Sequence, residues 1–459
     1  MTELWGSRKC ETLQGIDAGA SDTLTIIKSW RFKVKIQIND VFTLIDGEIY
    51  RKTVCIDKKI VSVGDSAPEA FNADITIDGH NRLLMPGMVN CHTHAYMSVF
   101  RNLADDLAFE EWLFKRISPL EDRLTPEDCY WGNMLSCLEM IKTGTTCFTD
   151  MHMSVRQSVR AVNESGMRAV ITRGLVGSDR NDEGGIRRIN EALDEMAYAK
   201  ELSCDRVRFM FGPHAIYTCG KDYLKYIAEI AQERSMGINI HLSETRHEVS
   251  ECLANNGVSP VKYLEELGMF GVPAIAAHCV YLDDEDIDIL KKHNVSVVTN
   301  PASNMKLGNG FAPVSRLLEK GINVALGTDS QASNNTLNMF TEMRLLSMIH
   351  KGAELNAQAM PAKTVLKCAT TNGCRAVGMG EEAGRIAAGA EADMVLLDID
   401  APQFYPRNNL TSALVYSANG SETDTVIING EIVMKNKEVL TIDTERVYYE
   451  INRITKNYI

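Results

Sequence analysis

The sequence predicts an α/β fold, a (β/α)8 barrel of the TIM type with a small β-sandwich domain formed from both chain ends. Between about residues 84 and 380, short apolar runs alternate with stretches of helical periodicity, which is typical of βα units and a parallel sheet. The two flanks carry short alternating runs separated by turn residues, which indicates antiparallel strands. A chain of 459 residues has room for a barrel of roughly 250 to 300 residues and a companion domain.

The companion domain is expected to combine residues 23–83 with residues 381–459. Its first part contains KVKIQI, VFTLI and KIVSVG, with an Asp-Gly turn signal at 46–47. Its second part contains ADMVLLDI and DTVIINGEIVMKNKEVL, with an Asn-Gly turn signal at 429–430. Residues 1–22 match neither pattern, and we expect them to form a flexible extension.

Eight apolar runs in the middle of the chain have the length of buried strands. The segments between them carry apolar residues at helical spacing, as in residues 222–236, where a glycine follows the last turn. Eight such strands with intervening helices favour a closed barrel over an open sheet. No glycine-rich phosphate loop follows the first run, which argues against a nucleotide-cofactor fold. The runs cover residues 83–92, 145–151, 168–175, 208–215, 238–244, 274–279, 295–301 and 322–330.

The composition indicates a cytoplasmic protein that acts on small molecules. The formal net charge of −13 disfavours nucleic acid and anionic membranes as partners, because affinity for polyphosphate comes mainly from clustered Lys and Arg. No window reaches about 18 consecutive apolar residues, and the N-terminus lacks the apolar region of a secretion signal. The twelve cysteines are scattered without a CxxC pair, and Cys91, Cys147 and Cys279 lie in apolar runs, so we interpret them as reduced.

The carboxyl ends of barrel strands carry the active sites of such folds, and five of the ten histidines stand there. His92 and His94 lie on the same side of the first strand, because side chains alternate with a period of two, so both reach one ion. His241 on the fifth strand and Asp329 on the eighth complete a set of imidazoles and a carboxylate. This set suits Zn²⁺ or a neighbouring divalent transition metal, with an open position for water, and ligand type does not distinguish Zn²⁺ from Fe²⁺.

Three further residues at these strand ends have roles that the residues alone leave open. Glu244, three residues after His241, is placed to face the activated water and pass its proton to the substrate. His278 is either a further metal ligand or a base that polarises the water. His214 binds substrate or packs in the core, and we favour substrate binding. The fourth strand, VRFMFGPHA, contains no lysine to bridge a second ion, so we expect a single metal.

Seven motifs follow one another along the chain: PGMVNCHTH, RNLADDLAFEEWL, FGPHAIYTC, INIHLSET, AAHCVYLDDEDI, NPASNMKLGNG and LGTDSQASNN. These motifs resemble the amidohydrolase superfamily and, within it, the family of 5-methylthioadenosine/S-adenosylhomocysteine deaminases. They cover the chain from about residue 35 to its end, in family order and at family spacing. The resemblance implies one Zn²⁺ per subunit on the four ligands named above, and it implies that His278 orients the catalytic water.

The implied reaction is the hydrolytic deamination of an adenosine-type nucleoside, such as 5′-methylthioadenosine, S-adenosylhomocysteine or adenosine, to the inosine-type product and ammonia. In such enzymes, water activated by the metal adds to the ring carbon that bears the amine. The resemblance implies that Glu244 protonates the adjacent ring nitrogen and that Asp329 and His278 handle the proton of the water. Similar enzymes commonly self-associate, which implies a homo-oligomer.

Substrate contacts carry over from the family residue by residue. Glu111 matches the family's acceptor of ribose hydroxyls, and His214 matches its substrate-binding histidine. Arg173 matches an arginine near the nucleoside. A second arginine is expected after a Gly-Gly pair, where the run GGIRRIN offers Arg187 or Arg188, and we take Arg187 as the candidate.

Two other interpretations are weighed against the nucleoside deaminase. The same metal set supports hydrolysis of a triazine-like ring or of guanine, because fold and ligands fix the nucleophile and not the leaving group. Glu111 favours the nucleoside, since a ribose-binding carboxylate has no evident role toward a bare heterocycle. A catalytically silent scaffold is disfavoured, because the ligands and Glu244 are all present. Asn102 departs from the glycine of many family members, and the preferred 5′ substituent is not indicated.

Overall fold

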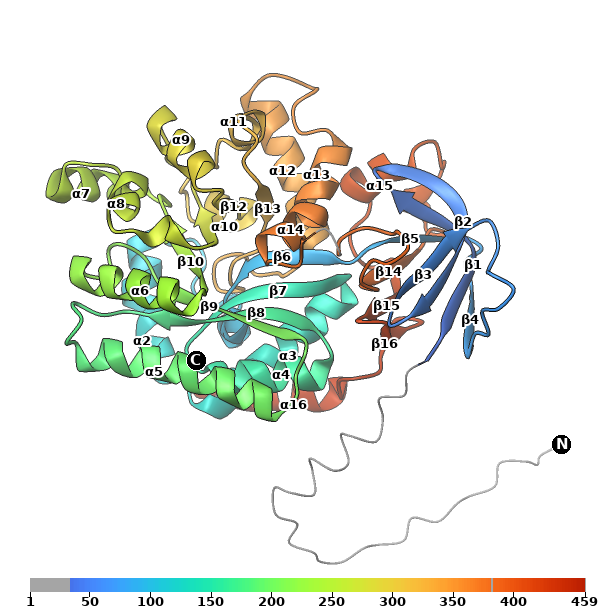
Figure 1. Ribbon diagram of the computed structural model, residues 1–459, viewed down its shortest axis with the longest axis horizontal. Coiled ribbons are helices and arrows are strands. Elements are labelled where there is room, and N and C mark those ends of the chain that lie inside the picture. Colours follow the sequence, from blue (N-terminus) through green and yellow to red (C-terminus); the bar gives the residue numbers. More distant parts are fainter. Residues whose placement is uncertain (1–33, 381–382, 459) are drawn as a thin grey trace, which may run out of the picture.

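The computed structural model describes residues 34–380 and 383–458 (Figure 1). The extension predicted for residues 1–22, and the part of the predicted small domain before residue 34, lie outside the described residues. Within the described ranges the predicted fold class is confirmed. Eight parallel strands form a barrel with helices around it, and a second sheet combines strands from both ends of the chain. Among the helices of these ranges, none combines the length and apolarity that a membrane span requires.

The barrel strands follow one another in chain order from β6 to β13. The first and last strands approach each other at Gly327, where an added Cβ would lie 2.8 Å from the Cβ of His92. The N–H of Asp329 donates to the carbonyl of His92 at 2.9 Å. A close approach that only glycine permits therefore brings two predicted ligands together. The strands are β6 Met88–Thr93, β7 Thr145–His152, β8 Arg168–Leu175, β9 Val207–Pro213, β10 Gly237–Leu242, β11 Ala274–His278, β12 Ser296–Thr299 and β13 Val324–Leu326.

The second sheet has nine strands, and β5 joins its N-terminal group to its C-terminal group by pairing with both β1 and β14. The predicted turn at 46–47 connects β1 to β2, and the predicted turn at 429–430 connects β15 to β16. All four turn residues have positive φ, as a type I′ hairpin turn requires. The strands are β1 Ile36–Ile45, β2 Glu48–Asp57, β3 Lys59–Gly64, β4 Ile75–Asp78, β5 Arg82–Pro86, β14 Met394–Asp398, β15 Thr423–Ile428, β16 Glu431–Lys435 and β17 Glu438–Val439.

The chain crosses from the second sheet into the barrel at Gly87. The first predicted strand run divides here, because β5 pairs with strands of the second sheet while β6 pairs with β7 of the barrel. An added Cβ at Gly87 would lie 2.1 Å from the hydroxyl oxygen of Thr146, so only glycine fits at the crossing. The first barrel strand therefore begins at Met88, after the domain boundary that we predicted at residue 84.

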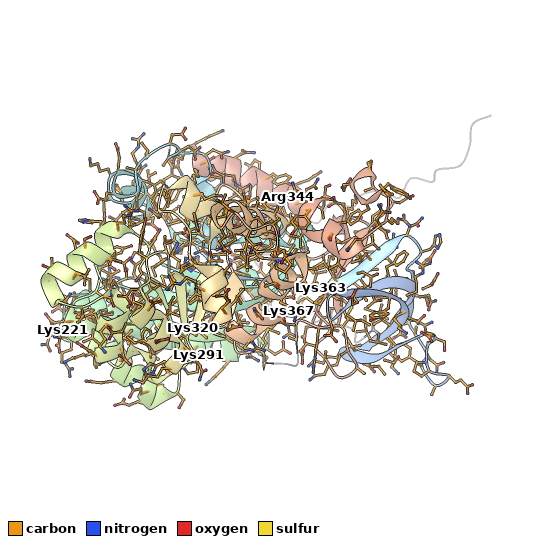
Figure 2. The ribbon with its side chains drawn as sticks, turned by 90° about the horizontal axis from the view of Figure 1, so that it is seen from above. Lys221, Lys291, Lys320, Arg344, Lys363 and Lys367 are labelled. Carbon is orange, nitrogen blue, oxygen red and sulfur yellow. The ribbon has the colours of Figure 1, made fainter. Side chains whose placement is uncertain are left out.

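Helices cover the outside of the barrel, and several begin at a side chain that caps their first N–H groups. In α3, the hydroxyl of Thr125 accepts from the N–H of Asp128, and the carboxylate of Asp128 accepts from the N–H of Thr125. α13 reaches the small sheet, where Lys363 donates to Glu48 of β2. Figure 2 shows Lys363 toward this sheet and Lys221 of α6 at the opposite end of the molecule. The helices are η1 Ala95–Phe100, η2 Glu111–Ile117, α2 Ser118–Glu121, α3 Pro126–Lys142, α4 Val155–Ser165, α5 Glu183–Glu201, α6 Lys221–Arg234, α7 Arg246–Asn256, α8 Pro260–Glu266, η3 Met269–Gly271, α9 Asp284–Lys292, α10 Pro301–Lys306, α11 Val314–Glu319, α12 Met339–Ala353, α13 Ala362–Ala369, α14 Thr371–Ala376, η5 Pro402–Phe404, α15 Leu410–Tyr416 and α16 Thr444–Thr455.

The C-terminal segment 381–459, which we expected to be β-sandwich material, also contains the helices α15 and α16. α16 packs against α3 of the barrel, with Val447 and Ile454 buried. After this helix, the hydroxyl of Tyr458 donates to the carboxylate of Asp128 at 2.8 Å. The end of the chain therefore stabilises a barrel helix in addition to supplying strands to the second sheet.

Apolar side chains fill the barrel near the starts of its strands. Val89, Val170 and Ile275 belong to one buried cluster that also includes residues of α14. Cys91 and Cys147 lie in the same cluster and are buried and free, as the apolar runs predicted. This end of the barrel is therefore apolar, whereas the predicted site residues lie at the carboxyl ends of the strands.

Candidate active site

The carboxyl ends of the barrel strands bring five predicted site residues into one buried cluster. His92 lies in β6, His241 in β10 and His278 at the end of β11, while His94 follows β6 and Asp329 follows β13. The ring centroid of His92 lies 4.8 Å from that of His241 and 5.3 Å from that of His278. Residues that are far apart in the sequence are therefore within reach of one ion.

Backbone turns at the strand ends direct these side chains inward. Ser243, His278 and Asp329 have φ angles of 51°, 72° and 63°. Such left-handed conformations cost a residue other than glycine about 1 to 3 kcal/mol each, and they concentrate at functional sites. Hydrogen bonds between neighbouring strands hold them, as where the N–H of Cys279 donates to the carbonyl of Leu242 at 2.9 Å.

His94 and His241 direct lone pairs at each other. Nδ1 of His94 lies 3.0 Å from the carbonyl oxygen of Met151, and Nδ1 of His241 lies 2.7 Å from that of His214. Because a carbonyl only accepts, each Nδ1 carries the proton and each Nε2 presents a lone pair. The two Nε2 atoms lie 3.2 Å apart, where the lone pairs repel unless they share a cation.

His92 and Asp329 complete the donor set. Neither ring nitrogen of His92 has a hydrogen-bond partner among the described residues, although both are buried. Burial lowers the pKa of His92 to about 4, so its ring is neutral and able to ligate at pH 7.

The Asp329 carboxylate is ionised and held in place. Its Oδ1 lies 3.5 Å from Nε2 of both His92 and His94, and its Oδ2 accepts from the hydroxyl groups of Ser303 at 2.6 Å and Ser333 at 2.9 Å. Burial alone would raise the pKa of Asp329. The hydrogen bond with His92 and the nearby rings of His92, His94 and His278 outweigh this effect and hold the pKa well below its usual range. An ionised carboxylate with three neutral imidazoles fits a divalent transition metal.

Glu244, the predicted proton donor, is buried beside this cluster. Its Oε1 accepts from Nδ2 of Asn309 at 2.9 Å and lies 3.7 Å from Nδ1 of His278. Burial and the charge of Asp329 raise the pKa of Glu244 well above its usual range, which favours the protonated form that a general acid needs. Nδ1 of His278 lies 2.8 Å from Oδ1 of Asn304 and 3.3 Å from Nδ2 of Asn300. The shorter contact is to an oxygen that only accepts, which assigns the proton to Nδ1 and the lone pair to Nε2.

Glu248 supports the backbone that carries Glu244, and sequence reasoning missed it. Its two carboxylate oxygens accept from the N–H of Ser243 at 3.0 Å and from the N–H of Glu244 at 2.7 Å. Burial raises the pKa of Glu248 to about 7, against the lowering effect of these backbone hydrogen bonds. The pattern Thr245-x-x-Glu248 is a helix-capping signal in the sequence, and here the carboxylate reaches back to the strand end.

A cavity of about 350 Å³ lies beside the cluster, a size that suits a small-molecule ligand. Its apolar wall comes largely from η1, η2 and the segment between them. Its polar side contains His94, His241, His278, Asp329 and Glu244, residues at or after the carboxyl ends of β7, β8 and β9, and the end of α2. The apolar wall includes Met97, Phe109, Trp112, Leu113 and Phe114, and the polar residues include His152, Arg173, His214, Thr218, Glu121 and Asp122.

The structure separates the two arginines between which the sequence did not decide. His214, Arg173 and Arg188 line the cavity, but Arg187 does not. The Arg187 side chain is 68% exposed and pairs with Glu191 at 3.5 Å. Consecutive residues of a helix point about 100° apart, so only one of the pair faces the cavity. The structure therefore favours Arg188 over Arg187 as the arginine that faces a ligand in this cavity.

The predicted ribose acceptor, Glu111, is exposed on η2 and does not line the cavity. Its neighbour Trp112 turns inward and is buried. Glu121 lines the cavity instead, because it lies one helical turn after the buried Ile117. Burial raises the pKa of Glu121 to about 7, against a hydrogen bond from the hydroxyl of Tyr96 at 2.5 Å. The spacing of four residues from Ile117 was the signal that sequence reasoning missed.

Comparison with known proteins agrees with this geometry. The chain matches the Amidohydrolase family over residues 83–433. It is 46% identical over 400 residues to the 5-methylthioadenosine/S-adenosylhomocysteine deaminase of Thermoanaerobacter pseudethanolicus, which covers 87% of this chain and 92% of that protein.

Two solved structures extend the comparison. An adenosine deaminase from Xanthomonas campestris with bound zinc is 29% identical, with a TM-score of 0.87 over 92% of this chain and 98% of that chain. An atrazine chlorohydrolase from Arthrobacter aurescens complexed with zinc is 20% identical and shares the fold, with a TM-score of 0.83 over 92% of this chain and 100% of that chain. Because the family match spans most of its length and the deaminase relative is 46% identical, the chain belongs to the Amidohydrolase family.

Proposed function

We propose that the protein is a metal-dependent aminohydrolase that converts adenosine-type nucleosides to inosine-type products and ammonia. The proposed substrates are 5′-methylthioadenosine, S-adenosylhomocysteine and adenosine. The observation that carries this proposal is the carboxyl group of Glu244, whose pKa is raised by burial, beside a candidate metal-ligand set in a cavity that also presents the carboxyl group of Glu121. The 46% identity to a protein named as such a deaminase supports the substrate class.

One divalent metal ion per subunit is part of this proposal. The facing lone pairs at the site and the unpartnered ring of His92 support it. Zn²⁺ is the simplest candidate, and Fe²⁺ shares the same ligand preference. When bound, the ion lowers the pKa of water and supplies a hydroxide nucleophile. The proposed ligands are His92, His94, His241 and Asp329.

Glu244 and its neighbours move the protons in the proposed reaction. Deamination adds water across a ring C=N bond and then breaks the bond from that carbon to the exocyclic amine. Glu244 gives its proton to the ring nitrogen as the C–O bond forms, and a proton of the water restores it. Asp329 and His278 hold the water and take its second proton, which converts the leaving amine to ammonia. Nε2 of His278 is suited to this role because Nδ1 is held by Asn304.

Glu121 takes the place of Glu111 as the proposed acceptor of ribose hydroxyls. The two oxygens of a carboxylate offer about four lone-pair sites, so Glu121 can accept from ribose hydroxyls in addition to the hydroxyl of Tyr96. His214, Arg173 and Arg188 are the further proposed substrate contacts, because all three line the cavity. The apolar wall at Trp112 offers a surface against which a planar base or a thioether packs.

Hydrolysis of a triazine-like ring or of guanine is the alternative function on the same metal set. The shared fold with the atrazine chlorohydrolase is compatible with it. Glu121 favours the nucleoside, because a bare heterocycle has no hydroxyl group for this carboxylate to accept. A catalytically silent scaffold is disfavoured by the intact ligand set and the raised pKa of Glu244.

Ammonia release tests the proposed function directly. The metal-reconstituted protein is incubated separately with adenosine, 5′-methylthioadenosine, S-adenosylhomocysteine, guanine and atrazine, and ammonia and chloride are measured. We expect ammonia from the adenosine derivatives and an absorbance change from the adenine to the hypoxanthine chromophore. Ammonia from guanine alone, or chloride from atrazine without turnover of any nucleoside, would support the alternative and refute the proposal.

We also propose that the protein is a cytoplasmic homo-oligomer. The buried, free cysteines Cys91 and Cys147 of the barrel support a reducing compartment. The mass of the full chain in solution, measured by light scattering, tests the oligomer, and a monomeric mass would contradict it. Localisation of the tagged full chain tests the compartment.

A further inference from the structure

Tyr96 is a cavity residue to which the proposed reaction assigns no role. It lies in η1, two residues after the proposed ligand His94, and it lines the cavity. Its side chain is only 3% exposed, so its hydroxyl group needs a partner inside the protein. That partner is Glu121, whose Oε1 accepts from the hydroxyl at 2.5 Å.

The ring of Tyr96 is held in place by His152. The two ring centroids lie 4.6 Å apart with the planes at 60°. Nδ1 of His152 accepts from the N–H of Ser154 at 2.7 Å, and Nε2 lies 2.7 Å from the side-chain amide of Asn133. Because both nitrogens of His152 are engaged, its ring forms a fixed wall that sets where the hydroxyl of Tyr96 points.

Glu121 depends on Tyr96 for its orientation. Within residues 34–380 and 383–458, the Glu121 side chain accepts a single hydrogen bond, which comes from the hydroxyl of Tyr96. The adjacent Asp122 is negatively charged and opposes ionisation of Glu121 instead of anchoring it. Without the hydroxyl of Tyr96, no hydrogen bond from the described residues would hold the Glu121 carboxylate in one orientation.

We propose that Tyr96 is a specificity-determining residue that orients Glu121 so that its second oxygen accepts the hydroxyl groups of a ribose ring. This inference rests on the proposed function, because it needs a substrate with such hydroxyls. The hydrogen bond from Tyr96 occupies Oε1, which leaves Oε2 for the ligand. A nucleoside that lacks the 2′ and 3′ hydroxyls gains nothing from this arrangement.

The test combines Tyr96→Phe with two substrates. The substitution removes the hydroxyl group and keeps the ring against His152. Values of kcat and KM are measured for adenosine and for 2′,3′-dideoxyadenosine. We expect the KM for adenosine to rise about tenfold, since hydrogen bonds to charged groups are the stronger ones, and kcat to change by less than about twofold, as when uniform binding is lost. The KM for 2′,3′-dideoxyadenosine is expected to stay unchanged.

Tyr130→Phe is the matched control. Tyr130 is also buried and also donates to a glutamate, Glu164, but neither residue lines the cavity. Its substitution is expected to leave KM unchanged for both nucleosides. A second measurement places Tyr96→Phe in a Glu121→Gln background, where it should add little to the KM for adenosine, because the two residues act through one interaction.

The outcomes separate this inference from the proposed function. An equal rise of KM for both nucleosides, or an unchanged KM for adenosine in Tyr96→Phe, would overturn the role of Tyr96 alone. Lack of turnover of both nucleosides by the unmodified protein would overturn the proposed function, and the role of Tyr96 with it. Partial unfolding of a variant does not imitate the expected result, because KM does not depend on the amount of folded enzyme.

Discussion

Glu244→Gln separates proton transfer from metal binding and substrate binding. Glutamine has nearly the same shape and keeps an oxygen that accepts from Asn309, as Glu244 does at 2.9 Å. What it loses is the acidic proton, which the raised pKa of Glu244 keeps in place. General acid catalysis contributes about 10² to 10⁴ in rate, which corresponds to about 3 to 5 kcal/mol. We therefore expect kcat for adenosine to fall by at least about 10².

The assay pairs ammonia release with elemental analysis of the same samples. The metal content of Glu244→Gln should equal that of the unmodified protein, because Glu244 is not among the proposed ligands. Glu111→Gln is the matched control, an exposed carboxylate outside the cavity, and its kcat should stay within about twofold of the unmodified value. Unchanged turnover in Glu244→Gln would refute the proton-transfer role. A fall in turnover that follows loss of metal would show that Glu244 acts through the metal site instead.

Three further outcomes are expected. His94→Ala removes one of the facing lone pairs, so the metal content after reconstitution should fall well below that of the unmodified protein, and a full metal content would contradict the ligand set. Glu121, with its pKa raised to about 7, ionises as pH rises, so the KM for adenosine should decrease between about pH 6 and about pH 8, whereas a KM that increases would exclude an ionised acceptor. Arg188→Ala should raise the KM about fivefold while Arg187→Ala changes it by less than about twofold, since only Arg188 lines the cavity, and the reverse order would restore the assignment made from the sequence.

The cluster of histidines and Asp329 at the strand ends was predictable because the barrel geometry is simple to read from a sequence. His92, His241 and His278 end strands whose apolar runs are clear, and the carboxyl ends of parallel strands meet on one face. Asp329 was found by the same reasoning at the eighth strand. The structure adds what spacing does not contain, such as the carbonyl partners that put a lone pair on Nε2 of His94.

The proposed substrate contacts were less predictable because they depend on how each helix is rotated about its own axis. Arg187 and Arg188 are neighbours in α5, and only the packing of that helix decides which one faces the cavity. Glu111 and Glu121 belong to one segment, but η2 is a π-helix, whose hydrogen bonds span five residues. An ordinary helical count through η2 therefore misplaces Glu111, whereas the α-helical count from Ile117 to Glu121 holds.

Contacts from distant loops position the segment that carries Glu121. The indole N–H of Trp112 donates to the carbonyl of Ala332 at 3.2 Å, three residues after Asp329. Asn102 has a φ of 60°, a conformation that asparagine tolerates better than most residues, and its side-chain oxygen accepts from Asn335 at 2.7 Å. Asparagine at this position thus adopts the positive φ that glycine would adopt, and its side chain adds a hydrogen bond to the loop after β13. Because that loop also carries Asp329, the apolar wall of the cavity and the proposed metal site are aligned by contacts that no sequence spacing encodes.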